Sequence, residues 1–159
     1  QALEKLVNIN ILFTKPNDDT GSNIVLKMIK NFIKKNRSRC KLYDSLGHRL
    51  YYSLIKQVDC VIGNSSSGLT EVPFLGTPSI NVGIRQSGRT GLNNIIDIKA
   101  SVPIIINIIN KALSKKNSKN KKKLNRDIYF KKGATNKIEK ILKKALSKKI
   151  IKYPFYDYL

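Results

Sequence analysis

The sequence predicts an α/β fold in which a parallel β-sheet is flanked by helices. Three observations lead to this prediction. Short apolar segments rich in β-branched residues alternate with helical segments, the connections are short, and polar loops follow the strand-like segments. At 159 residues the chain is long enough for one domain with a core. Ligands of such sheets bind at the carboxyl ends of the strands, so we expect the functional site among these loops.

The first part of the chain contains two strand–helix pairs. Residues 7–13, VNINILF, alternate and are rich in β-branched side chains, which is typical of a strand, and 14–22 form a turn-rich loop. Apolar residues at helical spacing then predict a helix that ends at about residue 36. We expect the second strand at 39–46 and a short helix at 48–57.

Three further strands are predicted in the middle of the chain. Residues 59–63, DCVIG, are compact and apolar and end at the segment GNSSSGLTE. We expect a two-turn helix at 67–76, with Gly76 near its carboxyl end, and Pro73 leaves the course of this helix open. Residues 78–83 and 94–98 are strand-like and enclose a polar loop punctuated by glycines.

The last third is predicted to be helical. Residues 102–113 form a helix with Pro103 in its first turn, where proline is tolerated. We expect one domain over residues 1–147, a Lys-rich segment at 111–152 and an aromatic tail at 148–159. The apolar residues of a final amphipathic helix are Ile138, Ile141, Leu142, Ala145 and Leu146.

The net charge of +21 lies mostly in the Lys-rich segment. A nucleic-acid surface is expected to place aromatic side chains among its basic residues, but KKNSKNKKKLNR contains none. Lysine also outnumbers arginine, which is the better partner for bases and phosphates. We therefore interpret the excess as solvated surface charge, and we keep a basic polyanion-binding protein as an alternative.

Composition excludes several other classes. Cys40 and Cys60 lie in apolar, strand-like surroundings, which predicts two reduced thiols and a cytoplasmic location. No spacing of His or Cys indicates a metal, no cofactor is expected, and no apolar run approaches the roughly 18 residues of a membrane span. Because the first residue is Gln1 and no signal peptide precedes the first strand, we expect a chain cut from a longer protein.

The segment GNSSSGLTE admits two kinds of chemistry. A serine nucleophile on a G-x-S-x-G turn is disfavoured, since Ser67 occupies the place of the second glycine. In addition, the only histidine, His48, precedes the serines, whereas that fold needs it after them. We expect His48 to be an exposed residue at the start of a helix.

Anion binding fits the same segment better. A strand that ends at Gly63 and leads through small residues into a helix presents free backbone N–H groups. Ser65 and Ser66 add hydroxyl donors, while Glu71 would repel phosphate but can accept hydrogen bonds from a ribose. The combination predicts a nucleotide, with phosphates at the serines and ribose at the glutamate. The alternative is an ordinary serine N-cap with a solvated glutamate.

Several motifs together resemble the hydrolysing UDP-N-acetylglucosamine 2-epimerases. They are G-N-S-S at 63–66, Glu71 five residues after the second serine, and G-x-R-Q-x-G-R at 83–89. The family's F-G-x-P segment is matched with one extra residue, and residues 16–22 are similar to its P-N-x-D-x-G loop. The resemblance extends over residues 8–145.

The resemblance implies the Rossmann-like, carboxy-terminal half of a two-domain, glycosyltransferase-B-like fold that binds UDP. It assigns the diphosphate to the serines, the ribose to the glutamate, the uracil to a leucine backbone and a tyrosine ring, and phosphate charge to an arginine. These residues are Leu46, Tyr51, Ser65, Ser66, Glu71 and Arg85. Asn17 and Asp19 are weaker candidates in a substrate loop, and Gln86 and Arg89 are expected to order the loop that carries the arginine.

The resemblance also implies an activity that this chain does not complete. The family eliminates UDP from UDP-N-acetylglucosamine or a related UDP-sugar and hydrates the resulting glycal, which yields N-acetylmannosamine for sialic-acid-type sugars. Its catalytic acids and bases lie in an amino-terminal domain that is absent from this sequence, so no catalytic residue is assigned. We expect this part alone to have almost no catalytic activity, and we expect that the intact protein can form a homo-oligomer. The alternative is that the chain is one half of a related UDP-sugar glycosyltransferase.

Overall fold

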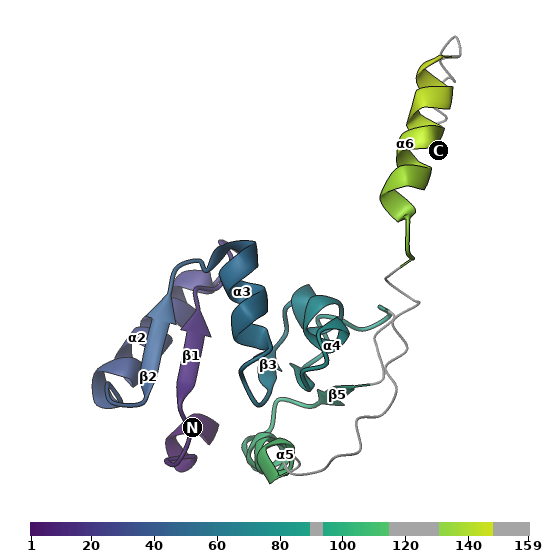
Figure 1. Cartoon of the computed structure of the whole chain (residues 1–159). Helices are drawn as coiled ribbons and strands as arrows, with labels where there is room; N and C mark the ends of the chain where they lie inside the picture. The colour runs from purple at the N-terminus through teal and green to yellow at the C-terminus, as the bar shows by residue number, and fades with distance from the viewer. Residues whose placement is uncertain (90–93, 115–130, 148–159) are drawn as a thin grey trace, which may run out of the picture. The chain divides into compact units, whose positions relative to one another are not determined.

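The computed structural model describes residues 1–89, 94–114 and 131–147 (Figure 1). The chain forms two units, Gln1–Leu124 and Asn125–Leu159, and each is described by itself.

The described strands of the first unit all pair in parallel, which confirms the predicted fold class. β1 (Ile11–Thr14) lies beside β2 (Cys40–Tyr43), and β4 (Ser79–Val82) lies between β3 (Val61–Gly63) and β5 (Ile95–Ile98). Parallel neighbours need crossover connections, and helices supply several of them. The strands form one ladder of two and one of three, since the described backbone has no ladder between β1 and β3.

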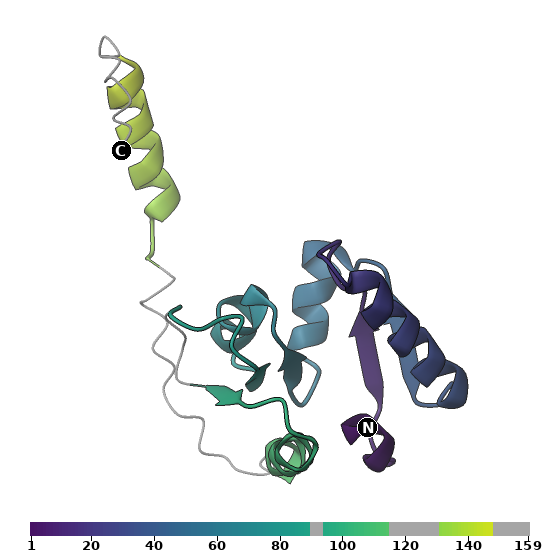
Figure 2. The same ribbon diagram turned by 180° about the vertical axis from the view of Figure 1, so that it is seen from behind.

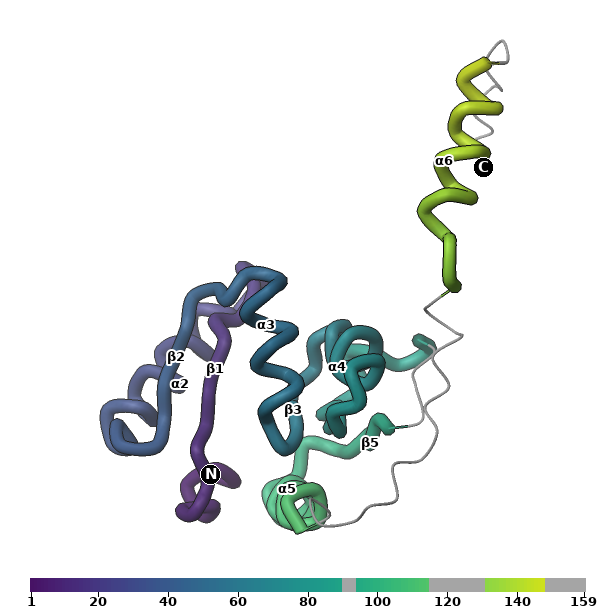
Figure 3. Tube along the Cα trace, viewed as in Figure 1, coloured from purple at the N-terminus to yellow at the C-terminus, as the bar shows by residue number. Residues whose placement is uncertain are grey.

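The helices follow the predicted order along the chain (Figure 3). α2 covers one face of the β1–β2 pair (Figure 2), and α1 packs against α5. The sequence did not predict α1, which is a single turn. The helical elements of this unit are α1 (Ala2–Lys5), α2 (Ser22–Lys35), α3 (Gly47–Ile55), the 3-10 turn η1 (Ser66–Gly68), α4 (Glu71–Phe74) and α5 (Val102–Ser114).

The prediction of a continuous helix at 67–76 is wrong. The chain forms η1 and then α4, with Leu69 and Thr70 between them. Pro73 explains the break, because it has no N–H to donate and its ring conflicts with the carbonyl four residues earlier in a helix. Gly76 follows α4 at a φ of 91°, a backbone conformation that suits glycine.

The main core lies between β4 and α5. Ile80 of β4, Ile109 and Ala112 of α5, and Leu6 after α1 form one buried cluster. Burying an isoleucine such as Ile80 contributes about 1.5–3 kcal/mol, so this cluster fixes α5 against the three-stranded ladder. The position of β4 then sets where the loops at its carboxyl end begin.

A single arginine fastens the amino-terminal segment to the start of β2. The guanidinium of Arg39 donates hydrogen bonds to the carbonyl oxygens of Leu3, Leu6 and Ile9, at 3.2, 2.8 and 3.4 Å. Arg39 also donates to Asn36 Oδ1, at 3.0 Å from Nε and 2.8 Å from Nη2. The guanidinium therefore donates to backbone carbonyl oxygens that are not paired in the β-ladders.

The second unit contains α6 (Ala134–Leu146), which is the predicted final amphipathic helix. Its large apolar side chains are exposed, for example Ile141 at 67% and Leu146 at 76%. Within the described ranges, no helix has the length and hydropathy needed to cross a bilayer. The lysine run at 115–123 and the aromatic tail lie outside the described residues, and the predicted domain limits stay predictions.

Both cysteines are free thiols, as the sequence predicted. Cys40 is buried and Cys60 is half-buried. Burial raises the pKa of each thiol, and the charge of Asp59 raises the pKa of Cys60 further. Both thiols are therefore held in their protonated, less reactive form.

Candidate functional site

Three loops meet at the carboxyl ends of the strands. They are the aspartate loop after β1 (residues 15–21), the serine loop after β3 (64–70) and the arginine loop after β4 (83–89). Side-chain hydrogen bonds join the arginine loop to each of the other two. We expected the functional site among the loops that follow the strands, and these three loops are joined to one another by side chains.

The serine loop presents hydroxyl groups at a single turn of 3-10 helix. Ser65 caps η1, with its Oγ accepting a hydrogen bond from the backbone N–H of Ser67 at 3.4 Å, and both Ser65 and Ser66 are exposed. Gly68 lets the loop pass close to β4, because a β-carbon there would lie 3.0 Å from Ser79 Oγ. Because only one turn of helix is present here, a helix dipole contributes little, and anion binding depends on the hydroxyls and on nearby cations.

Tyr51 is held against the serine loop. It projects from α3, is half-buried, and its hydroxyl lies 2.5 Å from Ser67 Oγ. This bond fixes the direction of the tyrosine ring. Leu46 precedes α3 and is half-buried, and His48 is exposed in the first turn of the same helix, as expected.

Glu71 begins α4 and is half-buried. The Thr70 hydroxyl contacts the Glu71 carboxylate and also lies 3.1 Å from the backbone carbonyl of Ser66. Thr70, the last residue of the serine loop, thus orients the glutamate. Its carboxylate has further acceptor capacity, because an ionised carboxylate can accept about four hydrogen bonds.

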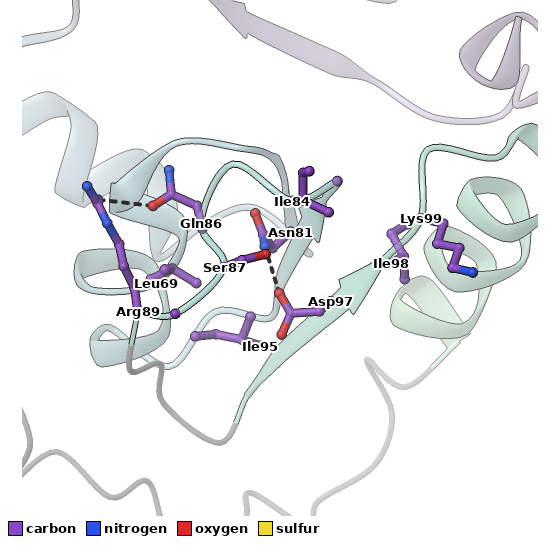
Figure 4. Close-up of a pocket in the computed structure, with 12 residues that line it drawn as sticks. Leu69, Asn81, Ile84, Gln86, Ser87, Arg89, Ile95, Asp97, Ile98 and Lys99 are labelled. Carbon is purple, nitrogen blue, oxygen red and sulfur yellow. Dashed lines mark hydrogen bonds between the residues drawn. The ribbon is translucent and has the colours of Figure 1, made fainter.

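The arginine loop is ordered by two side chains. The Gln86 amide is buried and donates to the carbonyl oxygen of Asn64 at 2.7 Å, and Arg89 Nη1 donates to Gln86 Oε1 at 3.0 Å (Figure 4). This is the ordering role that the resemblance implied for these two residues. Arg85, in contrast, is exposed and its Nη2 lies 2.8 Å from Asp19 Oδ2 in the aspartate loop. Asn17 is exposed in the same loop.

A groove of about 550 Å³ runs beside the arginine loop, between β4, β5 and Leu69 (Figure 4). At its floor, Asn81 Nδ2 donates to Asp97 Oδ1 at 2.6 Å across the β4–β5 ladder. None of the six predicted UDP residues lines this groove. The groove therefore gives no support to the predicted nucleotide site.

Sequence reasoning missed the contacts that orient the candidate residues. Ser67 holds Tyr51, Thr70 holds Glu71, and Asp19 contacts Arg85. Two signals in the sequence indicated the arginine loop, namely the G-x-R-Q-x-G-R motif and the glycines between the two predicted strands. The described residues contain no cluster of three or more His, Cys, Asp or Glu side chains able to hold a metal ion.

The fold defines the class of protein as a Rossmann-like α/β domain with its polar loops at the carboxyl ends of parallel strands. The chain belongs to the UDP-N-acetylglucosamine 2-epimerase family, whose family model matches residues 1–143. That family has a glycosyltransferase-B-like fold, of which this α/β domain is one half.

Three curated relatives share this similarity. The chain is 42% identical over 117 residues to the GDP/UDP-N,N'-diacetylbacillosamine 2-epimerase (hydrolyzing) of Campylobacter jejuni, covering 74% of this chain and 29% of that protein. It is 34% identical over 155 residues to polysialic acid biosynthesis protein P7 of Escherichia coli, covering 93% and 37%. It is 34% identical over 114 residues to the UDP-N-acetylglucosamine 2-epimerase of Neisseria meningitidis, covering 72% and 29%. The chain thus spans about a third of these relatives' length.

Proposed function

We propose that this chain is the UDP-binding part of a hydrolysing UDP-N-acetylglucosamine 2-epimerase that yields N-acetylmannosamine and UDP for sialic-acid-type sugars. The observation that carries the proposal is the joining of three strand-end loops, two of which carry Ser65, Ser66 and Arg85, in a member of this family. Family membership also favours this proposal over a glycosyltransferase half-domain. Free thiols support a cytoplasmic location, and homo-oligomerisation of the intact protein stays a prediction.

Each candidate residue has a role that its chemistry allows. Ser65 and Ser66 donate hydroxyl hydrogen bonds to the diphosphate, and Arg85 offers planar N–H donors and a positive charge. Glu71 accepts hydrogen bonds from the ribose hydroxyls, and the ring of Tyr51 offers a stacking face to uracil.

The contribution of this part to the reaction is electrostatic. When the bond between the sugar and UDP breaks, its electron pair goes to the diphosphate, so negative charge grows there in the transition state. Donors that are already oriented toward the diphosphate stabilise this charge more than they stabilise the bound substrate, which is what raises the rate. We assign no proton transfer to residues of this chain.

A second UDP-sugar is also a candidate substrate. The identity to the diacetylbacillosamine 2-epimerase, 42%, exceeds the 34% to the UDP-N-acetylglucosamine 2-epimerase of Neisseria meningitidis. The proposed contacts are to the nucleotide, which both sugars share. A diacetamido UDP-sugar is therefore the second candidate substrate.

Calorimetric titration of the chain with UDP, and with ADP as control, tests the proposal at moderate and high salt. We expect binding that prefers UDP and persists at high salt. Equal, salt-sensitive binding of both nucleotides would contradict the proposal and support the polyanion alternative, because a +21 chain binds phosphate nonspecifically. The glycosyltransferase alternative is tested with the intact protein. Release of a free 2-epimeric sugar would support the epimerase, whereas transfer of the sugar to an acceptor would support the glycosyltransferase.

A further inference from the structure

We propose that Asp19 is a positioning residue for Arg85, which it holds in place to receive the diphosphate; this inference rests on the proposed function. The two residues are 66 positions apart in the sequence and belong to the loops after β1 and β4. Asp19 Oδ2 and Arg85 Nη2 are 2.8 Å apart, a direct charge-assisted hydrogen bond. The bond joins the aspartate loop, which carries Asn17, to the arginine loop.

Both ends of this bond are anchored to ordered backbone. On one side, the carbonyl oxygen of Asp19 accepts from the backbone N–H of Ser22 at 3.0 Å, at the first residue of α2. On the other, the neighbour of Arg85, Gln86, is buried and bonded to the serine loop. Asp19 therefore holds the guanidinium and the ordered loop holds the Arg85 backbone, although the Arg85 side chain is 52% exposed.

The neighbouring aspartate shows that the pairing is specific to Asp19. Asp18 Oδ1 lies 3.7 Å from Lys15 Nζ, within the aspartate loop itself, and the Asp18 side chain is 93% exposed. Two adjacent carboxylates thus have different partners. Asp18 provides a matched control, because its removal changes the local charge by the same amount without touching Arg85.

The geometry leaves Arg85 free to bind phosphate while it is bonded to Asp19. A guanidinium has five N–H donors, and the bond to Asp19 uses one on Nη2. An exposed arginine loses side-chain freedom when it binds a ligand, and Asp19 removes part of that cost in advance. The opposing effect is repulsion between Asp19 and the diphosphate. Salt screens charges that lie apart more strongly than it weakens a direct contact such as the 2.8 Å bond between Asp19 and Arg85.

The test is a double-mutant cycle on the full chain, with UDP and uridine as ligands at high salt. We expect Asp19→Asn to weaken UDP binding about three- to tenfold and to leave uridine binding unchanged, while Asp18→Asn changes neither. Asp19→Glu, which keeps a carboxylate, should recover part of the loss. In the Arg85→Gln background, Asp19→Asn should have no further effect, because Asp19 acts through the arginine.

Several results would overturn the inference. An equal loss from Asp19→Asn with and without Arg85 would mean that Asp19 contacts the ligand directly. Tighter UDP binding by Asp19→Asn would mean that Asp19 competes with phosphate for the guanidinium, and an equal loss for UDP and uridine would mean a general structural role. If the unmodified chain does not prefer UDP over ADP, the proposed function itself fails and this inference fails with it.

Discussion

Replacing Gly68 with alanine should destabilise the protein, because the serine loop passes close to β4 at this residue. The added β-carbon would lie 3.0 Å from Ser79 Oγ, several tenths of an ångström inside ordinary contact distance. Ser79 is 1% exposed, so its hydroxyl has little room to move. Overpacking costs about 1–3 kcal/mol, while removing a glycine from the unfolded chain stabilises by about 0.4–1 kcal/mol. We expect a net loss of about 1 kcal/mol in the free energy of unfolding.

Urea unfolding followed by circular dichroism measures this loss. Gly63→Ala is the matched control, since a β-carbon at Gly63 meets no atom within 4 Å. Adding Ser79→Ala to Gly68→Ala removes the obstructing hydroxyl and should recover most of the lost stability. The reasoning is refuted if Gly68→Ala is as stable as Gly63→Ala, or if the double variant is no more stable than Gly68→Ala alone.

Three further predictions concern single side chains. Ser66→Ala and Glu71→Gln should each weaken UDP binding about tenfold, because each change removes a hydrogen bond in which one partner is charged. The thermal midpoint should stay the same. If calorimetry shows an unchanged affinity for UDP, the substituted residue does not belong to the site. Tyr51→Phe should lower the free energy of unfolding by about 1 kcal/mol, because it removes the bond to Ser67, and should weaken UDP binding less than Tyr51→Ala does. The pKa of Cys60 is raised in the folded state, so above the ordinary thiol pKa of 9.0 the unfolded chain loses this proton more readily than the folded chain. The free energy of unfolding should therefore fall as pH rises above 9.0. Urea titrations across that range should show a shallower fall for Cys60→Ser, and identical slopes would contradict the pKa shift.

The order of the strands and most helices could be predicted because hydrophobic periodicity is a local property. The alternation at 7–13 and the helical spacing after Gly21 are both visible in short windows of sequence. The break between η1 and α4 was not located, because Pro73 indicates that a helix at 67–76 is disturbed but not at which residues the backbone leaves it.

The candidate site was predictable only in part. Its residue types follow from the motifs, but the contacts that orient them join distant parts of the chain. The bonds from Asp19 to Arg85 and from Tyr51 to Ser67 depend on how strands and loops are placed in space. No periodicity or spacing in the sequence specifies such pairs.

The bonds that Arg39 makes have a consequence for which amino acids the start of the chain can tolerate. All three acceptors in that segment are main-chain carbonyls, which every residue type possesses. Apart from Leu3, Leu6 and Ile9, which pack in or against the main core cluster, the side chains of residues 3–9 can therefore be exchanged without loss of these hydrogen bonds. A lysine at position 39 could not replace the planar fork of the guanidinium. The hydrogen bonds that hold this segment thus depend on the identity of one residue, which lies 30 to 36 positions after the carbonyls that it contacts.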